Sequence, residues 1–251
     1  MKSFQMKALA LAVLGLAGFG VAGSAMACDN TNLAAWSQQL TNQGSLSVEA
    51  TGLEATASAC KLGVQLTGTD ALSAAGVAFN DSTTEPTYHF RFYFNQDNIG
   101  VLSAPGASAQ IFAVRAATLY PVGSSKANPF MFRLGITSDG TGTNKLVAAV
   151  ACDNGGGNIC LTSPIAIGAG NHYVEGALTT GASGTLKLWL DKNTTLAVQP
   201  APDASLTINN NGWGGGKNIV LGLGAHQPGW TLNQKVYFDA FDSRRQTFIG
   251  P

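Results

Sequence analysis

The sequence predicts an all-β protein that folds as a two-sheet antiparallel sandwich. Three segments, Tyr88–Phe94, Phe130–Ile136 and Leu186–Leu190, carry large apolar residues at every second position, which is the period of a half-buried strand. Glycine makes up 31 of the 251 residues, well above its usual share of about 7%. Turn clusters such as 139–142 and 209–212 lie between the strand-like segments. Because no helices alternate with these strands, we expect neighbouring strands to pair antiparallel.

Further segments of the same character complete the expected strands. They are Ser45–Ala50, Gly63–Thr67, Ala109–Arg115, Lys145–Ala151, Asn171–Leu178, Asn218–Gly224 and Lys235–Phe241. One short helix is expected at Leu33–Leu40. Since alternate residues of a strand point to opposite faces, the pattern also predicts the side chains between the two sheets, which are Phe90, Phe92, Phe132, Leu134, Leu188 and Phe238.

The composition excludes two classes of protein. Only 11% of the residues are charged, with 14 basic and 14 acidic side chains, so the chain lacks the basic surface that nucleic-acid binding requires. Hydrophobic residues make up 45% of the chain, which is enough to bury a core and argues against intrinsic disorder.

The first 27 residues have the pattern of a secretory signal peptide. An apolar run at Ala8–Val21 follows two lysines and precedes Ala25-Met26-Ala27, a small-residue pattern that signal peptidase recognises. The run is shorter than the roughly 20 residues of a membrane-spanning helix, which disfavours a retained anchor. We therefore expect residues 1–27 to be removed and 28–251 to form one secreted or periplasmic sandwich domain with no membrane span. Lipidation of Cys28 is the alternative, although the signal lacks the leucine usual in lipoproteins.

Four cysteines in an exported chain favour two disulfides. Cys152 and Cys160 flank a loop rich in Gly and Asn between two strand-like runs, so a bridge across the neck of a hairpin is expected there. This leaves Cys28 to pair with Cys60. A zinc site is the competing interpretation, but it would need C-x-x-C pairs or nearby histidines, which the sequence lacks.

Three segments, taken in order, resemble a known group of proteins. They are the aromatic strand Tyr88–Phe94, the Leu-x-Leu-Trp-x-Asp strand at Leu186–Asp191, and the closing segment Val236–Pro251, which contains YFDAF, SRR and IG. In this order they are similar to exported bacterial proteins with a laminin-G-like, concanavalin-like jelly roll, many of which have no assigned activity. The resemblance covers most of Ala35–Pro251 and implies a jelly-roll fold, although the two cysteine pairs are not typical of the group.

A catalytic pair is not recognisable in the sequence. Retaining glycosidases with this fold share a strand with the pattern Glu-x-Asp-x-x-Glu, whose carboxylates flank the scissile bond. No such spacing occurs among the four glutamates, which are Glu49, Glu54, Glu85 and Glu175. Asp239 and Asp242 are three residues apart, which predicts opposite faces of a strand. The chain also lacks a G-x-S-x-G motif.

Binding of a polysaccharide or a cell-surface glycan is the function that the polar strand faces favour. Aromatic rings stack on sugars, and planar polar groups hydrogen-bond to their hydroxyls. Arg91, Arg133, Glu175 and Trp189 lie on the expected non-core faces and would line one groove if the sheet is concave there. Trp213 lies in a Gly-rich loop that suits an exposed ligand platform. The alternatives are that Trp189 packs under a loop, that the arginines are ordinary solvated residues and that Trp213 is a buried anchor.

The resemblance also implies a structural calcium ion. Concanavalin-like folds often hold calcium on the convex side with an aspartate of the last strand as a ligand, which matches Asp239. Asp29 would join it if the terminal strands pair, and carbonyls and water would complete the shell. The alternative is that Asp239 accepts hydrogen bonds from turn amides or pairs with Arg244. A site on the convex side would lie across the sandwich from the groove.

Three functions are compatible with these features. The first is an exported, non-catalytic protein that binds a glycan or another surface ligand through a groove. The second is a polysaccharide-cleaving hydrolase or lyase, which a carboxylate pair roughly 5–9.5 Å apart would favour. The third is a structural component of the cell envelope or matrix, which an open sheet edge would favour, because edges recruit other strands.

Overall fold

A computed structural model describes most of the chain after the predicted signal peptide, which itself lies outside the described residues. The described residues are 28–29, 33–34, 36–54, 60–68, 73–80, 86–96, 108–116, 130–138, 140–152, 158–192, 199–209, 216–224 and 234–244. Two antiparallel sheets form a sandwich, which confirms the predicted all-β class. Among the described residues, no helix is long and apolar enough to cross a membrane.

The first sheet has seven strands in the order β13-β12-β11-β5-β15-β3-β2. Their bounds are β2 Gly44–Ala50, β3 Cys60–Leu66, β5 Thr87–Asn95, β11 Asn171–Thr179, β12 Gly184–Leu190, β13 Ala204–Ile208 and β15 Lys235–Arg244. β5 and β11 lie near its middle, so the aromatic strand predicted at 88–94 is flanked on both sides by long partners. This sheet positions the candidate site.

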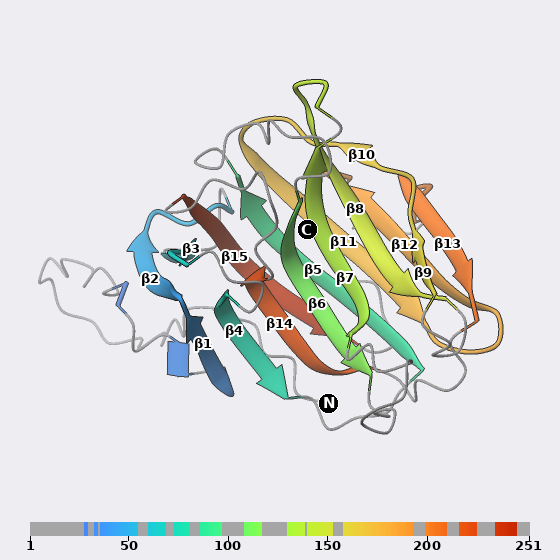
Figure 1. The fold of residues 1–251 in the computed structure, drawn as a ribbon, viewed down its shortest axis with the longest axis horizontal. Coiled ribbons are helices and arrows are strands. Elements are labelled where there is room, and N and C mark those ends of the chain that lie inside the picture. The colour runs from blue at the N-terminus through green and yellow to red at the C-terminus, as the bar shows by residue number, and fades with distance from the viewer. Residues whose placement is uncertain are drawn as a thin grey trace, which may run out of the picture.

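The second sheet has eight strands, in the order β1-β4-β14-β6-β7-β8-β10 with β9 also paired to β8. Their bounds are β1 Gln38–Asn42, β4 Ala74–Asn80, β6 Ser108–Ala116, β7 Phe130–Ser138, β8 Asn144–Ala151, β9 Ile159–Leu161, β10 Ile165–Ala166 and β14 Gly216–Gly224. In Figure 1 the two sheets overlap, with β6, β7 and β8 seen over β5, β11 and β12. All ten predicted strands are present.

The predicted helix at Leu33–Leu40 is wrong. Leu33 and Ala34 form only a short 3-10 turn, and the chain then continues as β1, an edge strand that pairs with β4 from Gln38↔Ala78 onward. Leu33 is buried in the core, while Trp36 packs on Phe241 with ring centroids 5.4 Å apart. Long-range pairing with β4 outweighs the weak helical pattern of this polar segment.

The core joins the two sheets through aromatic contacts. Phe90 of β5 lies 4.5 Å from Phe112 of β6 and 5.3 Å from Phe132 of β7, measured between ring centroids. All six residues predicted to lie between the sheets are fully buried or nearly so, which confirms the assignment of strand faces. Phe92 and Phe238, for example, are both 0% exposed.

A β-bulge in β15 changes the face of its second half. Asp239 pairs with Tyr93 of β5, but Asp242 pairs with Arg91, so one extra residue is inserted between the two aspartates. Ala240 takes up this insertion with φ of +45°. The prediction that the two aspartates occupy opposite faces is therefore wrong: both point outward with their β5 partners.

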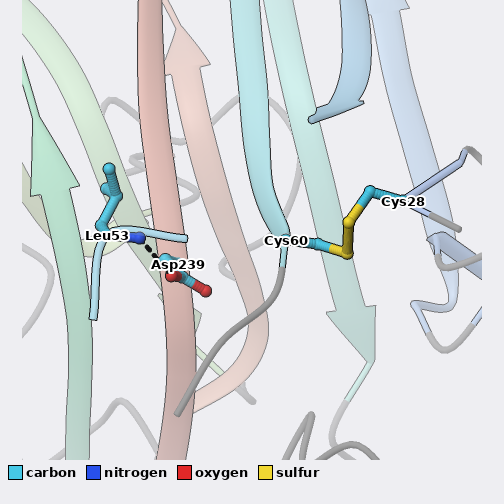
Figure 2. Close-up of a disulfide and its surroundings, with 4 residues drawn as sticks. All are labelled: Cys28, Leu53, Cys60 and Asp239. Carbon is cyan, nitrogen blue, oxygen red and sulfur yellow. Dashed lines mark hydrogen bonds between the residues drawn. A yellow bond between two sulfur atoms is a disulfide. The ribbon is translucent and has the colours of Figure 1, made fainter. Parts of the chain in front are cut away.

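Both predicted disulfides are present. Cys152 and Cys160 are joined across the neck of the hairpin between β8 and β9, with Cα atoms 5.7 Å apart. Cys28 and Cys60 are joined with Cα atoms 5.5 Å apart, which ties the N-terminal residues of the described chain to the start of β3 (Figure 2). The described residues contain no free cysteine.

Candidate functional site

The outward face of the seven-stranded sheet holds three of the predicted binding residues in one row. Glu175 of β11 lies opposite Trp189 of β12 on one side and opposite Arg91 of β5 on the other. Arg91 in turn lies opposite Asp242 of β15. We call these four side chains the charged row.

Two other predicted binding residues do not belong to this row. Arg133 lies on β7 of the eight-stranded sheet, so the prediction that it shares a groove with Arg91 is wrong. The alternation of residues along a strand identifies the outward face but not the sheet to which the strand belongs. Trp213 lies outside the described residues, and its role as a platform stays a prediction.

Three members of the charged row, Trp189, Glu175 and Asp242, are buried although they point away from the core. Trp189 is 0% exposed, and its Nε1 donates to the carbonyl oxygen of Pro200 at 2.8 Å. It therefore packs under the segment around Pro200, as the alternative interpretation proposed, and it does not offer an exposed face to a sugar. Glu175 is also 0% exposed and accepts a hydrogen bond from the Tyr173 hydroxyl at 2.8 Å.

Buried charge in this row affects its neighbours. The guanidinium carbon of Arg91 lies 5.9 Å from the ring centroid of Tyr173. Two residues before Arg91 on β5, burial lowers the pKa of His89, while the charge of Glu175 acts in the opposite direction. Burial also raises the pKa of Tyr93, with the charge of Glu54 adding to the effect. The lowered pKa of His89 and the raised pKa of Tyr93 both favour the uncharged form of the side chain at neutral pH.

Asp239 holds a backbone turn and lies on the same face as the charged row. Its Oδ2 accepts hydrogen bonds from the amides of Leu53 at 2.7 Å and Glu54 at 3.3 Å, and its Oδ1 accepts from the amide of Ala240 at 2.7 Å. Figure 2 shows Leu53 lying over β15 at this point. The prediction that Asp239 lies across the sandwich from the groove is wrong, because its strand pairs with β5 in the sheet that carries Arg91.

The calcium prediction is not decided by these contacts. Among the described residues, no group of three His, Cys, Asp or Glu side chains is placed to hold a metal ion. Hydrogen bonding of Asp239 to turn amides is the alternative interpretation from the sequence, and the structure confirms it. Calcium binding by Asp239 and Asp29 stays a prediction.

A hollow of about 290 Å³ opens on the outward face beside Asp239. Its floor comes from four strands of the seven-stranded sheet, and its rim comes from the segment that follows β2. The lining residues are Thr51, Gly52, Leu53, Lys61, Asn95, Asn171 and Tyr237. We call this site the amide hollow, because two asparagines from adjacent strands, Asn95 and Asn171, face each other in it.

A chain of hydrogen bonds fixes the rim of the amide hollow to its floor. Asn95 Nδ2 donates to Asn171 Oδ1 at 2.7 Å, and Asn171 Nδ2 donates to the carbonyl oxygen of Leu53 at 3.2 Å. The amide of Leu53 is held by Asp239. Thr51, at the rim, has φ of +67°, a left-handed conformation that is rare for a β-branched residue. The rim is therefore held in a defined and strained shape.

The start of β11, where Asn171 lies, is supported by Asp191, the residue that follows β12. Asp191 Oδ1 accepts from the amide of Tyr173 at 2.8 Å, and its Oδ2 lies 2.8 Å from Nδ1 of His172. Nε2 of the same histidine lies 3.0 Å from the carbonyl oxygen of Gly168. These contacts place both ring nitrogens of His172 against acceptors and hold the strand end beside the amide hollow.

Sequence reasoning did not identify the floor of the amide hollow. Asn95 is the next outward position after Tyr93, and Tyr237 is the outward position before Asp239, so alternation alone assigns both to a non-core face. Their proximity to Asn171 and Lys61 depends on the order of strands in the sheet, which the sequence pattern does not contain.

No family model matches the chain, and no curated protein matches it. Several solved structures share its fold. The alginate lyase Aly36B is 13% identical with a TM-score of 0.52, and the match covers 80% of this chain and 88% of that one. The cellulose induced protein Cip1 is 12% identical with a TM-score of 0.51, covering 84% and 90%. A carbohydrate esterase of the Shiga toxin-encoding bacteriophage phi24B is 11% identical with a TM-score of 0.50, covering 83% and 97%. These likenesses show a shared jelly-roll sandwich.

Proposed function

We propose that the protein is an exported, non-catalytic glycan-binding protein and that the amide hollow is its binding site. The observation that carries this proposal is the hydrogen-bonded arrangement of Asn95, Asn171 and the Leu53 carbonyl around an open polar hollow. Rigid planar amides beside an aromatic ring are the groups that sugar recognition requires, because hydroxyls need directed partners and the apolar faces of sugars need a flat surface.

The frame around the hollow suits recognition of a ligand without large conformational change. Asn95, Asn171 and Tyr237 occupy one row on three adjacent strands. The rim above them is fixed by Asp239, and the start of β3 is tied down by the Cys28–Cys60 disulfide. A preformed site avoids the entropic cost of ordering on binding, which favours affinity for a flexible ligand such as a polysaccharide.

Two further facts support the glycan class and export. Two of the proteins with the same fold are named as an alginate lyase and a carbohydrate esterase, so this sandwich is used on carbohydrate elsewhere. Two disulfides are stable in an oxidising compartment, which agrees with a secreted or periplasmic protein.

A glycan array with the mature protein, followed by calorimetry on the strongest ligand, tests the proposal. Asn171→Ala removes one amide and its bond to Leu53, so we expect a loss of affinity of about tenfold, the effect of one directed hydrogen bond left unmade. Thr207→Ala is the matched control, because Thr207 is exposed on β13 of the same sheet and does not line the hollow. Absence of binding to any glycan would refute the proposal.

Cleavage of a polysaccharide is the second candidate, and the charged row favours it. Glu175 and Asp242 point to the same side from strands that flank β5. Because neighbouring strands lie about 4.8 Å apart, their backbones are separated by roughly 9–10 Å, close to the carboxyl separation of inverting glycosidases. Both carboxylates are buried, at 0% and 3% exposure, which favours binding over catalysis. Release of reducing ends by the wild type, lost in Glu175→Gln, would establish the enzyme instead.

A further inference from the structure

We propose that the amide hollow is selective for acidic sugars and that Lys61 is the residue that recognises their carboxylate or sulfate group. This inference rests on the proposed function and adds the chemical class of the ligand. It begins from the charge of the hollow. Of the seven described residues that line it, Lys61 is the one that carries a charge at neutral pH, so a ligand in the hollow meets one cationic side chain.

Two carboxylates on strands beside β3 are hydrogen-bonded to partners other than Lys61. Glu49 lies opposite Lys61 in the pairing of β2 with β3, but its Oε1 is 2.6 Å from Nζ of Lys235 and accepts from the Ser47 hydroxyl at 2.9 Å. The pKa of Glu49 is lowered and that of Lys235 is raised, chiefly by this hydrogen bond. Asp239 has both oxygens on backbone amides. Both acids are thus hydrogen-bonded to groups other than Lys61.

An aromatic ring positions the ammonium group instead. Nζ of Lys61 lies 4.2 Å from the ring centroid of Tyr237, which is a cation–π contact. A neutral ring attracts the cation without accepting its hydrogen bonds in the way a carboxylate does, so the three N–H donors of the ammonium keep their capacity for an anion. The same ring and both asparagines lie in the hollow. An acidic sugar would therefore meet a cation, amides and an aromatic surface together.

Calorimetry with matched ligand pairs tests this selectivity. The first pair is oligogalacturonate and its methyl ester, in which a methyl group replaces the negative charge of each carboxylate. The second pair is chondroitin sulfate oligosaccharide and its desulfated, methyl-esterified form, so a preference in this pair that the first pair lacks indicates recognition of a sulfate. For at least one pair we expect the charged member to bind about tenfold more tightly at low salt. The difference should shrink as the salt concentration rises, because ions screen an exposed charge.

Variants at Lys61 show whether this residue is responsible. Lys61→Met keeps the aliphatic stem and removes the charge, so it should abolish the preference for the charged member of the pair. Lys61→Arg keeps the charge and should keep the preference, and thermal melting shows that both variants are folded. Lys145→Met, on β8 of the other sheet, is the control for a general loss of positive charge and should bind as the wild type does.

The outcomes separate this inference from the proposed function. Equal binding of charged and uncharged members overturns the selectivity, and a preference that survives Lys61→Met overturns the role of Lys61. Either result leaves glycan binding intact. The same holds if neither pair binds while a neutral glycan on the array does. Failure of every glycan to bind overturns both.

Discussion

Asp239→Asn tests the idea that one carboxylate shapes the rim of the amide hollow. The wild-type side chain is 4% exposed and accepts three backbone hydrogen bonds, from Leu53, Glu54 and Ala240. Asparagine keeps the shape but replaces one acceptor oxygen by an NH₂ group, so at least one of these amides faces a donor. Since hydrogen bonds to a charged group contribute about 1.5–3 kcal/mol each, we expect unfolding to become easier by about 2–4 kcal/mol. This corresponds to a melting temperature lower by roughly 5–15 °C for a domain of this size.

Thermal and urea unfolding, followed by circular dichroism, measure this effect. Asp29→Asn is the control, because Asp29 is an exposed aspartate and such surface changes usually stay within about 0.5 kcal/mol. The same pair tests calcium. If the ion binds through Asp239 and Asp29, calcium should raise the melting temperature of the wild type, and both substitutions should abolish that rise. An unchanged melting temperature in Asp239→Asn, with and without calcium, would refute a structural role for this carboxylate.

Three further predictions concern the core, a close approach between two paired strands and a half-buried histidine. Phe92→Ala should cost about 3–5 kcal/mol through lost burial and a cavity, and urea unfolding should show a much smaller loss for the neighbouring outward variant Tyr93→Ala; equal losses would mean that the strand faces are misassigned. Gly222→Ala should cost about 2–4 kcal/mol by the same assay, because φ is +143° there and an added Cβ would meet backbone atoms at 2.4 and 2.5 Å; a wild-type urea midpoint would contradict this. NMR titration should find the pKa of His89 below its ordinary value of 6.5, because burial disfavours the charged ring, and lower still in Glu175→Gln, which removes an opposing charge. Because the unfolded state then binds the proton more readily than the folded state, the stability due to His89 is complete above pH 6.5. It falls as the pH drops through the window between 6.5 and the pKa of His89 in the folded protein. A measured pKa at or above 6.5 would contradict this.

The sequence predicted most of the closing strand correctly, but the prediction missed one feature of it. Phe238 was correctly assigned to the core by alternation. The bulge that follows was not anticipated, although Phe238 and Phe241 repeat with the same three-residue spacing as Asp239 and Asp242. When an apolar pair and an acidic pair in one strand both have a spacing of three residues, the pattern indicates an inserted residue. In an uninterrupted strand, the second phenylalanine would point into solvent. The likeness to laminin-G-like proteins stays a prediction.

Local patterns in the sequence determined which segments are strands, which side chains enter the core and how the cysteines pair. These properties follow from the two-residue period of a strand and from short loops, which neighbouring residues control. The tertiary structure alone decided that Arg91 and Arg133 belong to different sheets, that Trp189 is covered, and that Lys61, Asn95, Asn171 and Tyr237 meet in one hollow. The physical reason is that the alternation of residues along a strand determines only whether a side chain faces the core. The neighbours of that side chain on the outward face depend on the order and register of strands that are far apart in the chain.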